Sequence, residues 1–213
     1  MMTPKTRPLP LPQAIAWGVL LFLAIGVSVV SARFLLPDPP MAEAMRPHLE
    51  ARPIAFLLHV ICGMTALSLG ALQFVTRQGR RRMWHAAAGR IYVLACLVGA
   101  VSGLILAWRS IGGPIGTAGF GLLAIAWFTT TALGFREVIA GRIEAHRRWM
   151  IRSYALTLAA VSLRLMLPAS AVMGLEFMDA YRAIAFLCWA PNLVLAELWL
   201  AWRGPEALRL ARA

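Results

Sequence analysis

The sequence predicts an all-α membrane protein, a bundle of six transmembrane helices. Of its 213 residues, 60% are hydrophobic and 14% are charged, whereas a soluble domain is about half apolar and about a quarter charged. The apolar residues fall into runs of roughly 20, long enough for a helix to cross about 30 Å of hydrocarbon. The net charge of +12 indicates contact with anionic lipid and not with nucleic acid, because no nucleic-acid-binding motif accompanies it.

Breaks that end helices separate the apolar runs. Three prolines within residues 37–40 follow the first run, Gly112–Pro114 follows the third, Gly174 follows the fifth and Gly204–Pro205 follows the sixth. We expect one membrane domain over residues 14–203, with tails at 1–13 and 204–213. The expected spans cover approximately residues 14–36, 53–75, 89–108, 114–135, 150–172 and 181–202.

Lysines and arginines are distributed unequally between the two sides of the predicted bundle. Fifteen of the 21 fall in the tails and in the second and fourth connections, five lie on the other side, and Arg164 lies inside a span. Because basic residues accumulate in cytoplasmic loops, we expect both termini in the cytoplasm and anionic lipid at that face. The basic start of the first run and the small residues Val30, Ser31 and Ala32 leave open a cleaved signal peptide.

Several polar residues lie inside the predicted spans, where each needs a partner or a function. His59 is about 6 residues, roughly 9 Å, into the second span. Arg164 lies at a similar depth in the fifth span, and no acidic residue of the spans lies there. Two interpretations of His59 remain open: a hydrogen bond to a neighbouring helix, or a cofactor or proton site facing the bundle interior. Arg164 either binds acceptors or an anionic ligand group inside the bundle, or reaches outward to the membrane surface. The predicted intramembrane polar site comprises His59, Gln73, Arg164, Asn192 and Glu197.

One face of the second span combines His59 with Gln73 at the opposite end of the helix. The two are 14 residues apart, which returns Gln73 to nearly the same face. Gly63 and Gly70 lie close to the same stripe, so we expect this face to pack tightly on another helix.

His85 and His146 open the third and fifth helices on the same side of the membrane, in similar surroundings. Each is followed by an Arg-x-Tyr sequence, Arg90 with Tyr92 and Arg152 with Tyr154, which suggests a faint repeat of a two-helix unit. One interpretation is a pair of interfacial histidines among arginines that face lipid. Another is a b-type haem whose iron is ligated by the two histidines and whose propionates bind the two arginines. A third is a role in proton transfer or in binding a lipid headgroup.

A resemblance covers about two-thirds of the chain, over residues 59–197. The residues that carry it are His59, Gly70–Phe74, His85, Gly89–Tyr92, Trp127, Thr129, Thr130, His146–Leu156, Leu163–Leu165, Pro191–Leu193 and Glu197. With these residues the sequence resembles a bacterial membrane-protein family known as domain of unknown function 2306, which implies a bacterial inner membrane as the location and no particular activity. A weaker likeness of arrangement connects the chain to six-helix b-type cytochromes, which pair histidines of the third and fifth helices.

Two functions from different classes remain. The first is a redox or haem-handling membrane protein. The second is a non-catalytic transporter, sensor or accessory subunit with a polar intramembrane site; the only transporter-like feature is that Pro168 and Pro191 fall within the last two spans. The sequence contains no hydrolase or kinase motif, and Cys62, Cys96 and Cys188 have no metal-ligand spacing, so we expect them to be small buried hydrophobic residues.

Overall fold

The computed structural model describes residues 11–36, 46–73 and 82–202, and these residues form helices only. Residues 1–10 of the predicted N-terminal tail, residue 203 with the whole predicted C-terminal tail, and the predicted end of the second span at 74–75 lie outside the described residues. Six helical segments are long and apolar enough to span a membrane, which confirms the predicted fold class and the number of spans; the orientation stays a prediction. These segments are Ala14–Leu35, Pro53–Gln73, Met83–Ala107, Gly113–Ile139, Ile143–Val172 and Phe177–Trp202.

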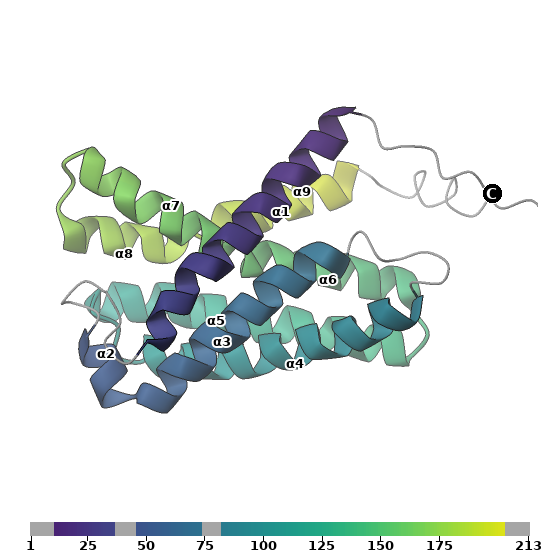
Figure 1. Cartoon of the computed structure of the whole chain (residues 1–213), viewed down its shortest axis with the longest axis horizontal. Helices are drawn as coiled ribbons and strands as arrows, with labels where there is room; N and C mark the ends of the chain where they lie inside the picture. Colours follow the sequence, from purple (N-terminus) through teal and green to yellow (C-terminus); the bar gives the residue numbers. More distant parts are fainter. Residues whose placement is uncertain (1–10, 37–45, 74–81, 203–213) are drawn as a thin grey trace, which may run out of the picture.

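The centre of the bundle consists of two helical hairpins (Figure 1). Helix α3 (Pro53–Gln73) packs mainly on α4 (Arg82–Ala107), and α5 (Gly113–Ile139) packs on α6 (Ile143–Thr157) and almost as extensively on α4. Helix α1 (Leu11–Ser31), which continues into the 3-10 helix η1 (Ala32–Leu35), crosses α3 diagonally. The remaining helices are α2 (Arg46–Ala51), α7 (Ala159–Val172), α8 (Phe177–Leu187) and α9 (Ala190–Trp202).

The bundle has two ends, each marked by the turn that it carries. The α7–α8 end carries the turn between α7 and α8 together with α2, and the opposite α5–α6 end carries the turn between α5 and α6 (Figure 1). Helices α4 and α6 begin at Arg82 and Ile143, about two turns before the spans predicted at 89 and 150. The predicted limits followed apolar content, whereas the first two turns of each helix contain charged and polar residues and extend the helices beyond the apolar runs toward the headgroup region.

The last two spans are each divided into two helices. The sixth breaks between Leu187 and Ala190, directly before Pro191, because proline has no N–H for the carbonyl four residues earlier. The fifth breaks at Leu158, whose carbonyl accepts the N–H of Val161 at 2.9 Å. Pro168, in contrast, lies inside α7 without ending it.

A cluster of hydrogen-bonded side chains joins the two hairpins in the core. We call Tyr92, Thr131, Ser153, Thr157 and Trp127 the hydroxyl cluster. The Tyr92 hydroxyl lies 2.9 Å from Ser153 Oγ, which lies 2.7 Å from Thr131 Oγ1. The indole N–H of Trp127 donates to Thr157 Oγ1 at 2.9 Å. Thr131 and Thr157 donate their own hydroxyl hydrogens to backbone carbonyls, so the cluster is satisfied internally.

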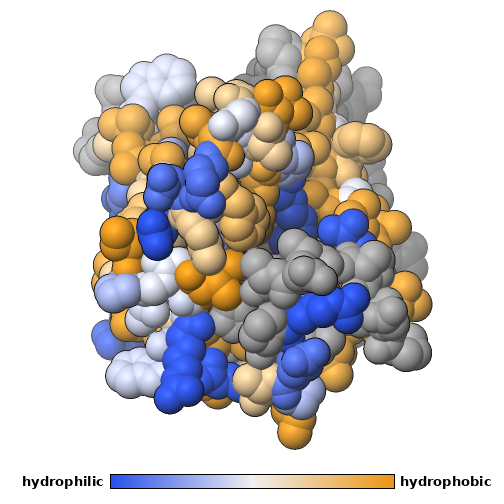
Figure 2. All heavy atoms as spheres, turned by 90° about the vertical axis from the view of Figure 1, so that its left-hand side faces the viewer, coloured by the Kyte–Doolittle hydropathy of each residue, from blue (hydrophilic) through white to orange (hydrophobic). Residues whose placement is uncertain are grey.

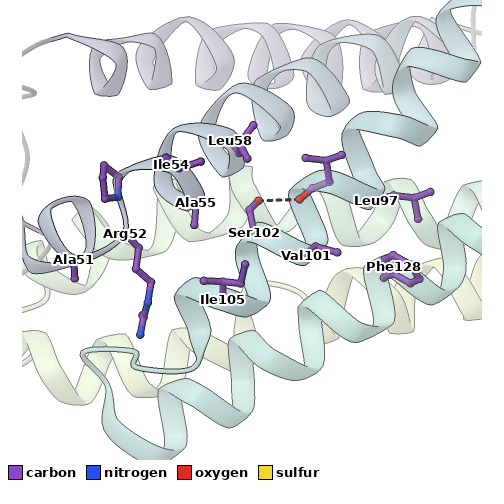
Figure 3. A pocket seen from close by; sticks show the side chains of 12 residues that line it. Ala51, Arg52, Ile54, Ala55, Leu58, Leu97, Val101, Ser102, Ile105 and Phe128 are labelled. Carbon is purple, nitrogen blue, oxygen red and sulfur yellow. Dashed lines mark hydrogen bonds between the residues drawn. The ribbon is translucent and has the colours of Figure 1, made fainter.

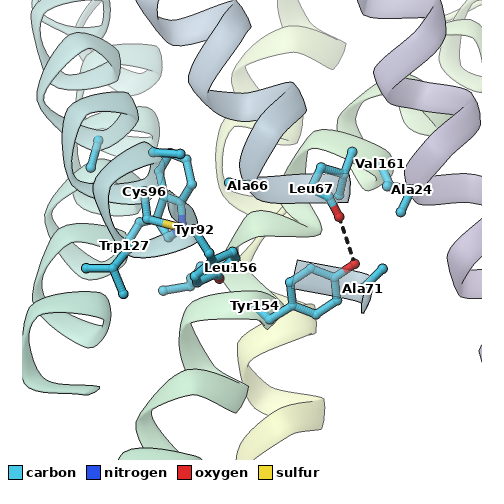
Figure 4. Packing of buried hydrophobic residues seen from close by; sticks show 13 residues of the cluster. Ala24, Ala66, Leu67, Ala71, Tyr92, Cys96, Trp127, Tyr154, Leu156 and Val161 are labelled. Atoms are coloured by element: carbon cyan, nitrogen blue, oxygen red, sulfur yellow. Dashed lines mark hydrogen bonds between the residues drawn. The ribbon is translucent and has the colours of Figure 1, made fainter. Parts of the chain in front are cut away.

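Apolar residues pack closely around the hydroxyl cluster (Figure 4). Leu67, Leu156 and Cys96 are almost fully buried there, and the Tyr154 hydroxyl donates to the Leu67 carbonyl at 3.2 Å. Cys96 and Cys188 are buried free thiols, as predicted, and Cys62 is half-buried. This part of the bundle is therefore a close-packed core that joins α3, α4, α5 and α6.

Candidate functional site

A cavity of about 410 Å³ lies within the bundle, on the α7–α8 side of the hydroxyl cluster, between α3, α4, α5, α7 and α8. Its walls are mainly apolar, with Phe56 and Phe120 among the aromatic side chains. Three basic side chains line it: His59 from α3, Arg164 from α7 and Arg33 from η1. Among the described residues that line the cavity, none is acidic. The cavity thus combines apolar walls with a cluster of basic groups.

His59 is held by the close approach of α3 and α4. Its Nδ1 lies 2.9 Å from the Gly99 carbonyl oxygen, and its ring packs on Gly103, where an added Cβ would lie 2.9 Å from Cε1. A carbonyl only accepts, so Nδ1 carries the hydrogen. In the neutral imidazole, Nε2 is then an acceptor, and in the charged form it is a donor. Either form can meet a polar group in the cavity.

Arg164 reaches the same cavity from α7. Its Nη1 donates to the Ala160 carbonyl at 3.0 Å, and the side chain is half-buried. No ion pair between residues that the structure describes involves Arg164. A guanidinium has five N–H donors in a planar fork that matches a carboxylate or phosphate. Its remaining donors are therefore suited to an anion in the cavity.

Helix η1 and the start of α8 form the edge of the cavity at the α7–α8 end. Arg33 is exposed and lies 4.9 Å above the ring of Phe34, which also lines the cavity. Viewed from this end, hydrophilic side chains gather over the middle and lower parts of the face (Figure 2). The carboxylate of Glu176 caps α8, and hydrogen bonds from the backbone N–H groups of Met178 and Asp179 lower its pKa.

Gly63 and Gly70, both expected to pack tightly on another helix, differ in the space around them. At Gly70 an added Cβ would lie 2.4 Å from the ring of Tyr154 and 2.8 Å from that of Tyr92, so tight packing is confirmed there. At Gly63 an added Cβ would meet no atom within 4 Å, so the prediction of tight packing is wrong for this residue. Gly63 lines the cavity, and its missing side chain contributes to the open space.

The structure brings together only part of the predicted intramembrane polar site. His59 and Arg164 line one cavity. Gln73 instead contacts α4: with its amide oriented to satisfy its hydrogen bonds, it donates to His85 Nδ1 at 2.7 Å. Asn192 donates to the Cys188 carbonyl and to Ser162 Oγ. Glu197 accepts two hydrogen bonds from Arg152, at 2.5 and 2.8 Å.

The predicted haem ligands each contact the preceding helix of their own hairpin. His146 Nδ1 lies 2.7 Å from the Gly134 carbonyl, so Nδ1 is protonated and Nε2 is free to accept in the neutral ring. His85 differs, because its Nδ1 accepts from Gln73 and the hydrogen of the neutral ring is then on Nε2. Both contacts span 12 residues, from 73 to 85 and from 134 to 146, which fits the suggested two-helix repeat.

These contacts do not support haem ligation by the two histidines. A haem ligated through Nε2 of His85 needs a lone pair on that nitrogen, and the Gln73 contact favours the other tautomer. Arg152 already binds Glu197 and stacks 4.8 Å from the Trp149 ring centroid, whereas Arg90 is exposed. Within the described residues, no three His, Cys, Asp or Glu side chains form a metal-binding group. Haem binding stays a prediction.

Sequence reasoning missed several cavity residues. Arg33 is one of the five basic residues predicted on the side opposite the termini, where nothing in the sequence indicated a site, and it lines the cavity with Tyr181 and Ser110. The spacing Gly99-x-x-x-Gly103 was an available signal, because two small residues four apart allow close helix contact. That contact is what positions the His59 ring.

The comparison with family models agrees with the sequence resemblance. Residues 56–200, about two-thirds of the chain, match the model described as "Predicted membrane protein (DUF2306)". The chain belongs to this family. Membership in DUF2306 and the six candidate spans make it a multi-pass membrane protein. No curated protein and no solved structure matches the chain, so the chemistry of this DUF2306 protein has to be argued from its own residues.

Proposed function

We propose that this protein is a non-catalytic membrane protein, a transporter, sensor or accessory subunit, that binds a small amphipathic anion in the cavity between His59 and Arg164. The observation that supports it is a 410 Å³ cavity with three basic groups and no acidic residue among the described residues of its wall. The volume lies within the range of about 300–1,000 Å³ typical of small-molecule sites.

The charge of Arg164 determines the polarity of the ligand. A guanidinium at membrane depth is costly unless it has counter-charges or acceptors, and its one described acceptor is the Ala160 carbonyl. A carboxylate or phosphate would accept two parallel N–H bonds from it. His59 Nε2 adds a group that donates or accepts according to its protonation.

The side chains of the cavity wall determine the chemistry of the part of the ligand that does not contact Arg164. Leu163, Leu123 and Phe120 line the cavity together with Trp127, whose indole N–H already bonds Thr157. These surfaces favour an apolar body and give no reason for further polar groups. A single-tailed amphiphile with one anionic head fits both parts of the site.

Ligand binding is tested with matched acids and alcohols on purified protein in detergent. We expect decanoate to bind and to raise the unfolding temperature, and decanol to bind at least about tenfold more weakly, because it lacks the charge-assisted hydrogen bonds. Arg164→Leu should remove the preference for the acid, and Arg164→Lys should retain part of it. Equal binding of decanoate and decanol to the wild type would contradict the proposal.

The cavity itself is tested by filling it. Gly63→Leu places a side chain where an added Cβ meets nothing within 4 Å, so it should block decanoate while the protein stays folded. Gly18→Leu is the matched control, because Gly18 is also open but lies exposed on α1 away from the cavity. Unchanged decanoate binding by Gly63→Leu would place the ligand elsewhere.

A b-type haem between His85 and His146 is a second proposal, carried over from the sequence. It requires Gln73 to turn its amide so that the His85 hydrogen moves to Nδ1. Protein from cells supplied with a haem precursor should then show a Soret band and sharpened reduced bands, lost in His85→Ala and in His146→Ala but kept in His48→Ala. A folded preparation that takes up no added haemin would contradict it.

A further inference from the structure

A second hollow lies on the outer side of the α3–α4 contact. It is a surface groove of about 740 Å³ between the start of α3, the second half of α4 and α5 (Figure 3). Leu58 and Ser102 line this groove, whereas their neighbours His59 and Gly103 line the interior cavity. The groove is therefore separate from the proposed anion site.

The walls of the groove are suited to hydrocarbon. Ile54, Val101, Ile105 and Phe128 line it and are all exposed. Ser102 is the one hydroxyl among its described lining residues, and it donates to the carbonyls of Val98 and Gly99. No polar group on the floor of the groove therefore requires water or a polar ligand.

A single basic side chain lies at the α7–α8 end of the groove. Arg52, directly before α3, extends away from α3 and past Ile105 at one end of the groove (Figure 3). Its guanidinium makes no hydrogen bond or ion pair to any residue that the structure describes. At the end of a span an arginine lies at headgroup level, where phosphates are its natural acceptors.

We infer that this groove binds an anionic phospholipid from the leaflet at the α7–α8 end, with an acyl chain along the groove and the phosphate on Arg52. Along α4 the lining residues run from Ile105 to Leu97, a rise of about 12 Å from the headgroup side into the hydrocarbon. Charge at one end and apolar walls along this depth match the two parts of a phospholipid. The inference does not depend on the proposed anion site.

Titration of delipidated full-length protein with lipid, followed by native mass spectrometry, tests the site. Wild type should bind phosphatidylglycerol about tenfold more tightly than phosphatidylcholine with the same chains, because choline offsets the phosphate charge that Arg52 attracts. Arg52→Gln should reduce the affinity for phosphatidylglycerol to that for phosphatidylcholine. Arg109→Gln, an exposed arginine beyond α4 and outside the groove, should leave the preference unchanged.

A second pair of variants tests the groove. Val101→Trp should weaken both lipids severalfold by filling the groove, while Leu94→Trp, on the same helix and also exposed but outside the groove, should not. Three results would overturn the inference: an unchanged preference in Arg52→Gln, displacement of phosphatidylglycerol by inorganic phosphate, or unchanged lipid binding in Val101→Trp. A dimer of the wild type that Val101→Trp dissociates would also overturn it, because a second copy would then occupy the groove.

Discussion

The hydroxyl cluster and the interior cavity are both polar regions of one bundle, yet they differ in how their polar groups are satisfied. In the hydroxyl cluster, Tyr92 and Ser153 bond each other, and Thr131 and Thr157 donate to carbonyls. In the cavity, Arg164 donates to one carbonyl and pairs with no described carboxylate. The first region is closed by its own bonds, and the second has hydrogen-bonding capacity left for a ligand.

This difference shows that a polar residue inside the membrane is not by itself a functional signal. Hydroxyl groups that bond one another join helices and leave nothing to bind. A charged group beside open space has donors that only a ligand or water can satisfy. The ratio of polar donors to available acceptors in each region therefore distinguishes a structural role from a binding role.

The largest expected effect separates two glycines on one face of α3. Gly63 and Gly70 are seven residues apart, about 20° around the helix. Gly70→Leu would overlap the Tyr154 and Tyr92 rings and should lower the free energy of unfolding by about 3 kcal/mol or more. Gly63→Leu should leave it unchanged or raise it by up to about 1 kcal/mol, because glycine is a poor helix former. Thermal and denaturant unfolding in detergent measure both.

Equal destabilisation by Gly63→Leu and Gly70→Leu would show that the cavity is not open at Gly63. Gly18→Leu, on the exposed side of α1, gives the baseline for adding leucine at a site without neighbours. It should change the free energy of unfolding by no more than about 1 kcal/mol.

The next effect compares two threonines of α5. Thr131 is fully buried and bonds Ser153 and the Trp127 carbonyl, whereas Thr129 is exposed. Thr131→Val keeps the shape of the side chain and removes its hydrogen bonds, so it should lower the free energy of unfolding by about 1–2 kcal/mol. Thr129→Val should stay within about 0.5 kcal/mol of wild type. Denaturant unfolding measures both variants. Equal changes in the free energy of unfolding would show that the hydrogen bonds of Thr131 in the hydroxyl cluster do not stabilise the protein.

The fold was largely predictable, because apolar runs of spanning length encode helices directly. The breaks within the fifth and sixth spans were harder to predict. Pro191 marks the break in the sixth span, but the break at Leu158 has no proline, and Pro168 lies inside α7. Helix bending of this kind depends on how α7 packs against neighbours, and a single sequence does not contain that information.

The site was predictable only in part, for a related reason. Depth along a helix follows from counting residues, so His59 and Arg164 were expected at one level, and both line the cavity. The rotation of each helix about its own axis, which decides the neighbour that a side chain faces, does not follow from counting residues. Gln73 and Glu197 were therefore grouped with them, although they bond His85 and Arg152 at other points of the bundle.

A smaller effect is expected from Arg164→Leu in the absence of ligand. Removing a guanidinium that has no described ion pair leaves no partner charge uncompensated, so the free energy of unfolding should change by less than about 0.5 kcal/mol or rise. Arg152→Leu is the contrast, because it leaves Glu197 without its two hydrogen bonds and should destabilise. Strong destabilisation by Arg164→Leu alone would assign Arg164 to the structure and weaken the case for an anion site.

The smallest effect concerns the edge of the cavity, where the Glu176 carboxylate caps α8 and fixes its first turn, which carries Phe177 and leads into the turn that carries Tyr181. Hydrogen bonds from the Met178 and Asp179 N–H groups hold the pKa of Glu176 below its ordinary value of 4.5. A lowered pKa in the folded state means that the cap stabilises α8 above about pH 4.5 and that this contribution is lost as pH falls through the folded pKa. The protection factor of the Asp179 amide in hydrogen exchange should therefore fall in wild type as the pH is lowered from about pH 4.5 through the folded pKa of Glu176. Glu176→Gln should give a lower factor that stays level over this range, because the amide accepts more weakly and does not titrate. A wild-type protection factor that is flat with pH would show that the carboxylate does not hold this turn, and that the edge of the cavity depends on the packing of Phe177 and Tyr181 instead.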